Sequence, residues 1–263
     1  MNKGSVPYLY ISAGGIQGGG HGGWSCELNG RDALPAAGEI LEAAATQPIE
    51  ADRLVVLVAD DLLHPLRIQL DQKVAKSDLK SFLLWKLKRY LPYPIEQVEL
   101  RFVPLQEPGN YLTFSLPRPW LARLFEGLEQ RGVHAGYVGG LFSFLLENRK
   151  GFRNRLCLGL FRDFYLLAEL DGRGNYLRFR TRRLPFTAEG TLDRQTWLTS
   201  DLEPLLRQQG KPLLMLNFAQ ELDGDCRHLS ADLRRLSPEL VLAPLQGATL
   251  ARFEACMRDE VAP

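Results

Sequence analysis

Residues 77–103 read Ser-Asp-Leu-Lys-Ser-Phe-Leu-Leu-Trp-Lys-Leu-Lys-Arg-Tyr-Leu-Pro-Tyr-Pro-Ile-Glu-Gln-Val-Glu-Leu-Arg-Phe-Val. Ser77 is a suitable helix N-cap, because its hydroxyl can accept a backbone N–H left unpaired at a helix start. Apolar residues then recur at spacings of three and four, which predicts one buried helix face. These residues are Leu79, Phe82, Leu83, Leu87 and Tyr90. Pro92 ends this predicted helix, and Pro94 keeps the following residues extended.

The residues after this proline corner alternate between apolar and polar, as in a half-buried strand. Val98, Leu100 and Phe102 fall on one face, and Glu99 and Arg101 fall on the other. We therefore expect a helix, a rigid corner and a strand that share one small core. Its predicted members at the corner are Trp85, Tyr90, Leu91 and Phe102.

Length and composition limit the possible classes of protein. The chain has 263 residues, enough for one large domain or two lobes with sizeable cores. Its formal net charge is +1, so no global field indicates binding to nucleic acid or to a membrane surface. The four cysteines are widely spaced and the sequence shows no secretory signal, which predicts a reducing cytoplasm. No apolar run approaches the roughly 20 residues that span a bilayer, so we expect any membrane attachment to come through a partner.

Strand and helix patterns alternate along the whole chain, which predicts an α/β protein. A first series of strands is predicted at Val6–Ser12, Trp24–Leu28 and Leu54–Ala59. A second series is predicted at Leu156–Leu160, Phe164–Leu170, Tyr176–Arg183 and Pro212–Phe218. The polar segment near residues 151–154 separates the two series.

The glycine cluster after the first strand has two interpretations. It comprises Gly14, Gly15, Gly18, Gly19, Gly20, Gly22 and Gly23. Bare backbone N–H groups could hold a phosphate, but no Gly-Lys-Ser/Thr ending is present. The alternative is a mobile hairpin tip without a function.

Several polar groups are candidate sites, each with a plainer alternative. Asp60 and Asp61 follow a buried strand, where α/β sheets place metal-binding carboxylates, or they belong to a solvated loop. His64 is predicted to be a loop residue. The arginines of residues 176–183 could bind an acidic partner or form a solvated sheet face. The acidic, Cys and His residues of 223–228 lack the spacing of a metal site.

The corner resembles the type IV pilus assembly protein PilM, an actin-like protein related to the cell-division protein FtsA. The resemblance rests on Trp85, Tyr90-Leu91-Pro92-Tyr93, Ile95-Glu96-Gln97-Val98 and Leu100-Arg101-Phe102. The cytoplasmic part of the type II secretion protein GspL is similar at the same corner. The resemblance implies a two-lobed actin-like (ribonuclease H-like) α/β fold. We expect a first lobe at residues 1–150 with a small α+β subdomain inserted at about 72–118, and a trimmed second lobe at 151–263.

Actin-like ATPases hold nucleotide through an Asp-x-Gly hairpin in each lobe and a Gly-Gly turn under the adenosine. The corresponding segments here are 10–15, 157–163 and 217–221, and they lack the leading aspartates and the glycine turn. Magnesium bound to nucleotide phosphates needs such carboxylates. We therefore predict a degenerate actin-like fold without cofactor, metal or catalytic activity. The alternative is an ATP-binding actin-like protein that uses Asp60, Asp61 or Asp163.

PilM-like proteins hold the cytoplasmic tail of the membrane protein PilN in a narrow channel near this corner. The resemblance thus implies a cytoplasmic scaffold of a type IV pilus or type II secretion platform, located at the inner face of the inner membrane. Its expected partner is a PilN-like bitopic protein, with other platform components possible and with neither nucleic acid binding nor direct membrane insertion. The expected partner-binding residues are Arg67, Trp85, Arg89, Leu91, Tyr93 and Arg101.

Overall fold

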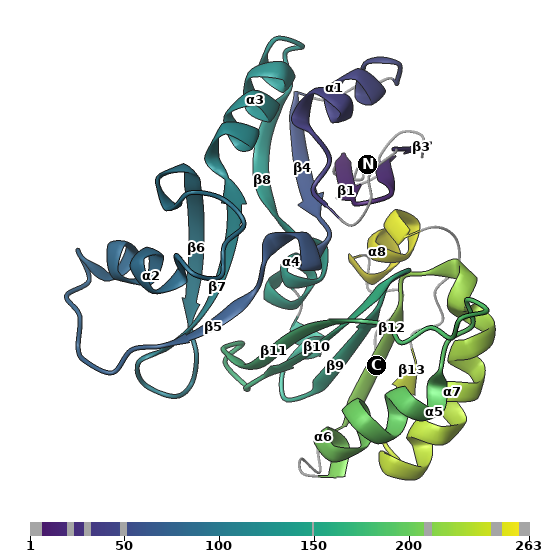
Figure 1. Cartoon of the computed structure of the whole chain (residues 1–263). Helices are drawn as coiled ribbons and strands as arrows, with labels where there is room; N and C mark the ends of the chain where they lie inside the picture. Colours follow the sequence, from purple (N-terminus) through teal and green to yellow (C-terminus); the bar gives the residue numbers. More distant parts are fainter. Residues whose placement is uncertain are drawn as a thin grey trace. The chain divides into compact units, whose positions relative to one another are not determined.

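The chain forms two compact units in a computed structural model (Figure 1). The structure describes residues 7–19, 24–28, 33–47, 52–148, 150–207, 212–242 and 249–257. The first unit is Met1–Phe144 and the second is Leu145–Pro263, so the division falls near the expected lobe boundary. Each unit is described by itself.

The larger sheet of the first unit has the strand order β3-β2-β1-β4-β8. Its strands are β1 (Tyr8–Ser12), β2 (Gly15–Gly19), β3 (Trp24–Glu27), β4 (Arg53–Val58) and β8 (His134–Gly140). β1, β2 and β3 pair antiparallel, whereas β4 pairs parallel to both β1 and β8. The continuous apolar run of β4 fits this central position, because a strand between two others is covered on both faces.

Residues 15–19 of the glycine cluster form strand β2, so this part of the cluster is not a hairpin tip. The turn consists of Ala13 and Gly14, and Gly15 already pairs with Ser12. A Cβ atom on Gly18 would come within 2.2 Å of the Trp24 ring, so glycine lets that ring lie against β2. Gly20, Gly22 and Gly23 lie outside the described residues.

Two helices, α1 (Ala37–Ala45) and α3 (Arg118–Glu129), pack against each other alongside β4 and β8 (Figure 1). The Trp120 Nε1–H on α3 donates a hydrogen bond of 2.7 Å to the Pro35 carbonyl oxygen before α1. Gly132 follows α3 with φ +73°, a conformation that suits glycine at a helix end. β8 then leads directly into α4 (Leu141–Asn148).

A small subdomain is inserted between β4 and α3. Its antiparallel sheet has the order β5-β7-β6, with β5 (Leu66–Gln69), β6 (Val98–Pro104) and β7 (Asn110–Pro117). The helix α2 (Leu79–Leu87) covers this sheet, and their shared core contains Ile68, Leu70, Leu83, Leu87, Val98 and Leu100. The helix–corner–strand prediction is therefore confirmed for the elements, with a one-turn 3-10 helix at Ile95–Gln97 in the corner.

Some details of the predicted corner were wrong. The N-cap of α2 is Asp78, whose side chain makes no capping hydrogen bond, and Ser77 precedes it. Trp85 and Tyr90 are 63% and 64% exposed instead of packing between helix and strand. The physical reason is helical geometry, because Leu83 and Leu87 turn the buried face toward the sheet and Trp85 falls on the opposite face. Leu91 and Phe102 do pack against the small core.

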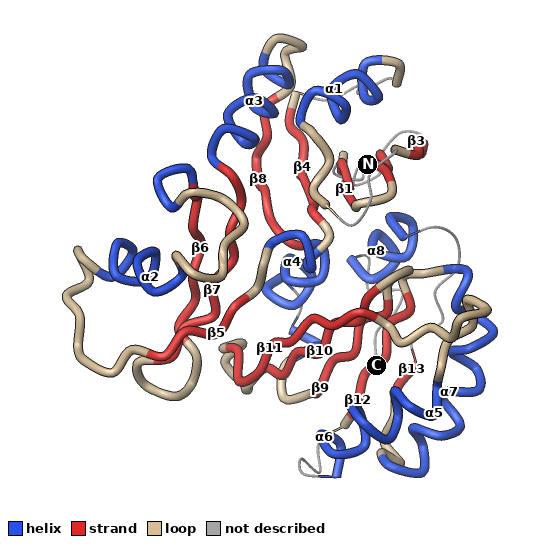
Figure 2. Tube along the Cα trace, in the orientation of Figure 1, coloured by secondary structure: helices blue, strands red, loops and turns tan. Residues whose placement is uncertain are grey.

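The second unit has one sheet of order β11-β10-β9-β12-β13 (Figure 2). Its strands are β9 (Leu156–Leu160), β10 (Phe164–Leu170), β11 (Tyr176–Arg183), β12 (Leu213–Asn217) and β13 (Val241–Leu242). Its helices are α5 (Arg194–Trp197), α6 (Glu203–Arg207), α7 (Asp223–Leu236) and α8 (Thr249–Met257). A π-helical turn at Leu198–Leu202 joins α5 to α6.

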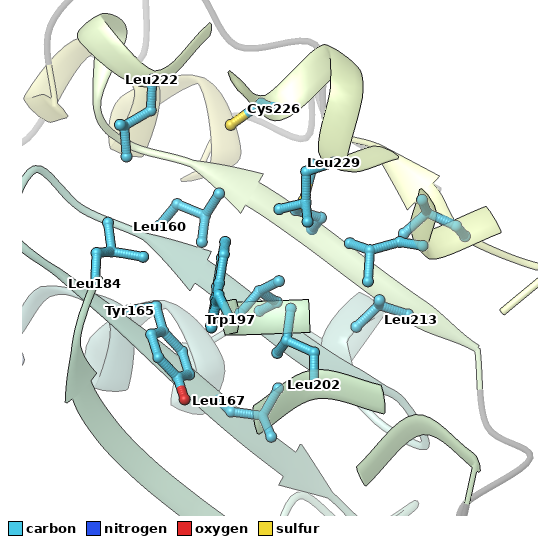
Figure 3. Close-up of a cluster of buried hydrophobic side chains, with 14 of the residues drawn as sticks. Leu160, Tyr165, Leu167, Leu184, Trp197, Leu202, Leu213, Leu222, Cys226 and Leu229 are labelled. Carbon is cyan, nitrogen blue, oxygen red and sulfur yellow. The ribbon is translucent and has the colours of Figure 1, made fainter. Parts of the chain in front are cut away.

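The core of the second unit lies between the sheet and helices α5 and α7 (Figure 3). β9 and β12 are buried along their whole lengths. The Trp197 ring is 1% exposed, and its centroid lies 5.1 Å from that of Tyr165. Residues 223–228 form the first turns of α7.

All four cysteines lie in the described part of the chain, and none of them forms a disulfide. Burial raises the pKa of the Cys157 and Cys226 thiols to about 12, so both stay protonated at neutral pH. Among the described helices, none is both long and apolar enough to cross a bilayer.

Candidate functional site: a pocket in the first unit

A pocket of about 230 Å³ lies between the small subdomain and the larger sheet of the first unit. Strands β6 and β7 form one wall, α3 forms a second, and the end of β8 with the start of α4 forms the third. Its lining residues are Leu63, Glu99, Leu100, Arg101, Phe114, Ser115, Leu116, Leu121, Phe125, Val138, Gly139, Gly140 and Ser143.

Most of the pocket surface is apolar. Leu100, Phe114 and Leu116 come from the small sheet, and Leu121 and Phe125 come from α3. Phe125 on α3 is 36% exposed, so part of the apolar surface remains open to a ligand. A few polar side chains, among them Arg101 and Ser115, accompany these residues. Such a combination is typical of sites that bind apolar side chains and fix their orientation with few hydrogen bonds.

Two strands that line the pocket are the last strands of their sheets within the described residues. β6 ends the small sheet and β8 ends the larger one. A terminal strand carries backbone N–H and C=O groups on its open side, and an extended peptide can pair with them. The pocket could therefore take an extended segment through both its side chains and its backbone.

Arg101 links the two strands across the pocket. Its guanidinium donates a hydrogen bond of 3.1 Å to the Tyr137 hydroxyl and lies 5.8 Å from the centroid of that ring. The Tyr137 ring in turn meets Phe144 edge to face at 4.6 Å. These contacts hold the Arg101 guanidinium at the pocket, where it can donate a hydrogen bond to a carbonyl or carboxylate oxygen.

Asp60 contacts the pocket residue Ser143 and is buried, so the solvated-loop interpretation of this residue was wrong. Its side chain is 0% exposed and accepts hydrogen bonds from the backbone N–H groups of Phe142 (2.8 Å) and Ser143 (3.1 Å). The Ser143 hydroxyl donates to it as well. Asp60 thus caps α4 from another part of the chain and satisfies N–H groups at the helix start.

Burial raises the pKa of the Asp60 carboxyl to about 6, although the hydrogen bonds from Ser143 and Phe142 favour the ionised form. Gly140 allows the Asp60 carboxyl to approach the start of α4, because a Cβ atom on residue 140 would come within 2.1 Å of the Asp60 Oδ1. Asp61 is partly buried beside it. Sequence reasoning missed this cap because its partners lie more than 80 residues away.

In the second unit, aromatic rings occupy the turn where an actin-like ATPase would carry its second Asp-x-Gly hairpin. Phe161 stacks on Phe164 at 4.4 Å and on Phe218 at 5.1 Å. Asp163 is exposed in the same turn. The apolar stack presents carbon atoms at the ends of β9 and β12, a poor environment for phosphate or a hydrated cation.

A buried arginine of α8 contacts the turn that follows β12. Arg252 on α8 is 1% exposed and donates to the Asn217 carbonyl oxygen (2.8 Å) and to both carboxylate oxygens of Asp223 (2.9 and 2.8 Å). This arginine lowers the pKa of the Asp223 carboxyl. The carboxylate of Asp223 is therefore engaged in an ion pair with Arg252. Among the described residues, no three potential metal ligands lie close together.

The structure brings only part of the predicted partner-binding set to the pocket. Arg101 lines it. Tyr93 reaches it indirectly, since its hydroxyl is hydrogen-bonded at 3.0 Å to the Ser115 hydroxyl, and burial raises its pKa. Arg67 lies on β5 and pairs with Glu107 and Asn110. Leu91 packs on the small core, and Trp85 and Arg89 are exposed on or next to α2.

Two other candidates have structural roles. His64 adopts φ 45° at the end of a 3-10 turn, and burial lowers its pKa. Its ring meets Tyr93 edge to face at 5.8 Å. In the arginine stripe of β11, Arg178 pairs with the buried Glu169 at 3.4 Å. The stripe lies on the last strand of its sheet within the described residues.

Comparison with solved structures gives matches over almost the whole chain. One match is the PilM-PilN type IV pilus biogenesis complex, with 18% identity, a TM-score of 0.59, and coverage of 98% of this chain and 96% of the other. The fold is actin-like. A second match from Bacteroides thetaiotaomicron, a protein with an actin-like ATPase fold and unknown function, has 12% identity, a TM-score of 0.57 and 97% coverage of both chains.

The cytoplasmic domain of EpsL is a third structure with similarity to this actin-like chain. EpsL is an inner-membrane component of the type II secretion system of Vibrio cholerae. The identity is 15%, the TM-score is 0.53, and the alignment covers 96% of this chain and 95% of the other. No family model and no curated protein sequence matches the chain. The resemblance noted at the corner is thus confirmed by structural similarity, and at these identities the similarity establishes the fold.

Proposed function

We propose that this chain is a cytoplasmic scaffold of a type IV pilus or type II secretion platform, and that its pocket binds the cytoplasmic tail of a PilN-like inner-membrane protein. The observation that carries the proposal is an apolar pocket between the open edges of β6 and β8. The similarity to PilM in its complex with PilN and to EpsL supports it. A scaffold function needs a preformed binding surface, which reduces the ordering cost of association.

Within this proposal, the tail is extended and places an apolar side chain between Leu116 and Phe125. Its backbone pairs with an open strand edge, and Arg101 donates to one of its oxygen atoms. Tyr93 positions Ser115 through their hydrogen bond. The remaining predicted residues, Arg67, Trp85, Arg89 and Leu91, lie outside the lining of this pocket, so we assign them no direct contact with the apolar side chain.

Arg101→Glu is expected to weaken binding of a PilN-like tail peptide at least tenfold. The substitution removes the hydrogen-bond donor and puts a carboxylate in its place, which repels the carbonyl and carboxylate oxygens of the peptide. A tenfold loss of affinity corresponds to about 1.4 kcal/mol. Fluorescence titration with a labelled tail peptide measures the effect. Arg67→Glu is the matched control, since Arg67 is an exposed arginine of the same small sheet on the opposite edge strand β5.

Equal loss of affinity in the Arg67 and Arg101 variants would argue against the pocket. A larger loss in Arg67→Glu would move the binding site to the β5 edge. If no pilus or secretion tail binds the wild-type protein, the scaffold proposal fails altogether. Thermal unfolding of both variants establishes that they remain folded.

We also propose that the chain does not hydrolyse ATP and binds nucleotide weakly at most. The support is the Phe161–Phe164–Phe218 stack and the buried Asp60, whose carboxylate accepts two backbone N–H groups and one hydroxyl. Isothermal calorimetry with magnesium-ATP is expected to give no affinity tighter than about 1 mM, a binding free energy near −4 kcal/mol. Micromolar affinity would favour the alternative, an ATP-binding actin-like component of the same machinery.

A further inference from the structure

The helix α2 and the residues that flank it in the chain expose aromatic rings and cationic side chains. We call this surface the basic-aromatic face, and it consists of Lys73, Lys76, Trp85, Lys88, Arg89 and Tyr90. Figure 1 shows α2 at the margin of the first unit, on the small subdomain. This face is separate from the pocket, since none of its members is among the lining residues.

Exposure of Trp85 follows from the packing of the helix. Leu83 and Leu87 are 0% and 1% exposed and fix which side of α2 faces the sheet. Trp85 lies between them in sequence and so falls on the opposite side of the helix. Arg89 follows the end of α2 and is exposed as well. The Trp85 ring rests against Phe82 with centroids 5.5 Å apart, and it is still 63% exposed. The ring is therefore held in position at the surface.

The charge around this ring is strongly positive. Residues 71–90 contain six cationic side chains and two carboxylates, whereas the whole chain carries a net charge of +1. Lys80 pairs with Glu99, and Lys86 pairs with Asp71. Lys73, Lys76, Lys88 and Arg89 have no anionic partner among the residues that the structure describes. This part of the surface is thus complementary to an extended negative charge.

We propose that the basic-aromatic face contacts the anionic headgroups of a phospholipid bilayer. Tryptophan and tyrosine favour the membrane interface, where an apolar ring and a polar edge are both accommodated. Nearby lysine and arginine side chains are attracted to anionic lipids. Three of the four unpaired cations are lysines, whose compact charges suit a mobile headgroup layer better than the fixed bidentate geometry of a protein carboxylate.

This contact goes beyond the proposed function and does not depend on tail binding. A single weak attachment gives only marginal membrane residence, and a second one multiplies its effect. Direct lipid contact would also revise the expectation that the membrane is reached only through a partner. It involves surface adsorption, with no segment crossing the bilayer.

Vesicle co-sedimentation of the full chain tests the proposal. The probes are vesicles of phosphatidylglycerol and phosphatidylcholine in equal amounts, and vesicles of phosphatidylcholine alone. The wild-type protein is expected to sediment with the first and to be released by salt, because exposed charges are screened. The double variant Lys88→Glu/Arg89→Glu is expected to reduce the partition constant about tenfold or more. Trp85→Ser/Tyr90→Ser is expected to reduce it about fivefold.

The chain offers matched controls in the second unit. Arg234→Glu/Arg235→Glu reverses an adjacent exposed pair at the end of α7, and Phe186→Ser removes another exposed aromatic ring. Both are expected to bind vesicles as the wild type does. Circular dichroism melting establishes that each variant is folded.

Failure of the wild type to sediment with anionic vesicles would overturn the proposal. Equal binding to phosphatidylcholine, or equal loss in the α7 control, would also overturn it, because the face would then confer no lipid selectivity. If the face variants bind vesicles normally and lose a purified acidic protein partner, the face is a protein-binding surface. Titration of the tail peptide against the same variants keeps the two proposals apart, since tail affinity is expected to be unchanged.

Discussion

Asp60→Ala is expected to lower the free energy of unfolding by about 3 kcal/mol near pH 5, because it leaves buried donors without an acceptor. Those donors are the backbone N–H groups of Phe142 and Ser143 and the Ser143 hydroxyl. Urea denaturation of wild type and variant measures the difference. Asp78→Ala is the matched control, since Asp78 is also a helix N-cap and its side chain makes no capping bond. We expect that control to cost under about 0.5 kcal/mol.

The destabilisation by Asp60→Ala should depend on pH in a defined direction. The pKa of Asp60 is raised from 3.8 to about 6 on folding, so the folded state binds the extra proton between these values. Its contribution to stability is fully present below the unfolded pKa and is lost as pH rises through about 6. The difference between wild type and variant should therefore shrink from pH 5 to pH 7. A difference that grows with pH would show that the ionised carboxylate is the stabilising form.

Because Asp60 caps the helix that carries Ser143, the same variant should loosen one wall of the pocket. Tail affinity is then expected to fall even under conditions where the variant is folded. Unchanged affinity in a folded Asp60→Ala protein would separate the pocket from the cap.

Trp197→Ala is expected to lower the free energy of unfolding by about 3–5 kcal/mol, the usual cost of truncating a buried aromatic side chain. Trp197 is the largest fully buried side chain of the second unit and packs on Tyr165 (Figure 3). Because the chain has two compact units, one global unfolding curve does not report on the second unit alone. Hydrogen exchange of β9 and β12 is therefore the direct measurement. Their amide protection should fall by the same free energy.

Trp197→Phe is the matched variant for this experiment. It keeps an aromatic ring beside Tyr165, and it loses no hydrogen bond, because the indole N–H has no acceptor among the described residues. We expect it to cost less than half as much as the alanine variant. If both substitutions cost the same, ring packing is not the source of the stability.

The sequence by itself determined the elements and the fold class. Alternation in residues 98–103 and the continuous apolar run in residues 54–58 predicted β6 and β4, because side-chain periodicity follows directly from strand geometry. The residues of the proline corner pointed to the actin-like fold. All these signals are local in the chain.

Only the tertiary structure decided where the polar and aromatic side chains lie. Asp60 looked like a metal ligand or a loop residue until Phe142 and Ser143, over 80 positions away, were placed against it. Trp85 and Tyr90 were predicted to be buried, and the register of Leu83 and Leu87 against the sheet left them exposed. The pocket exists because β6 and β8, strands of two different sheets, come together. Contacts between distant segments depend on how whole elements pack, and no periodicity within one segment encodes that packing.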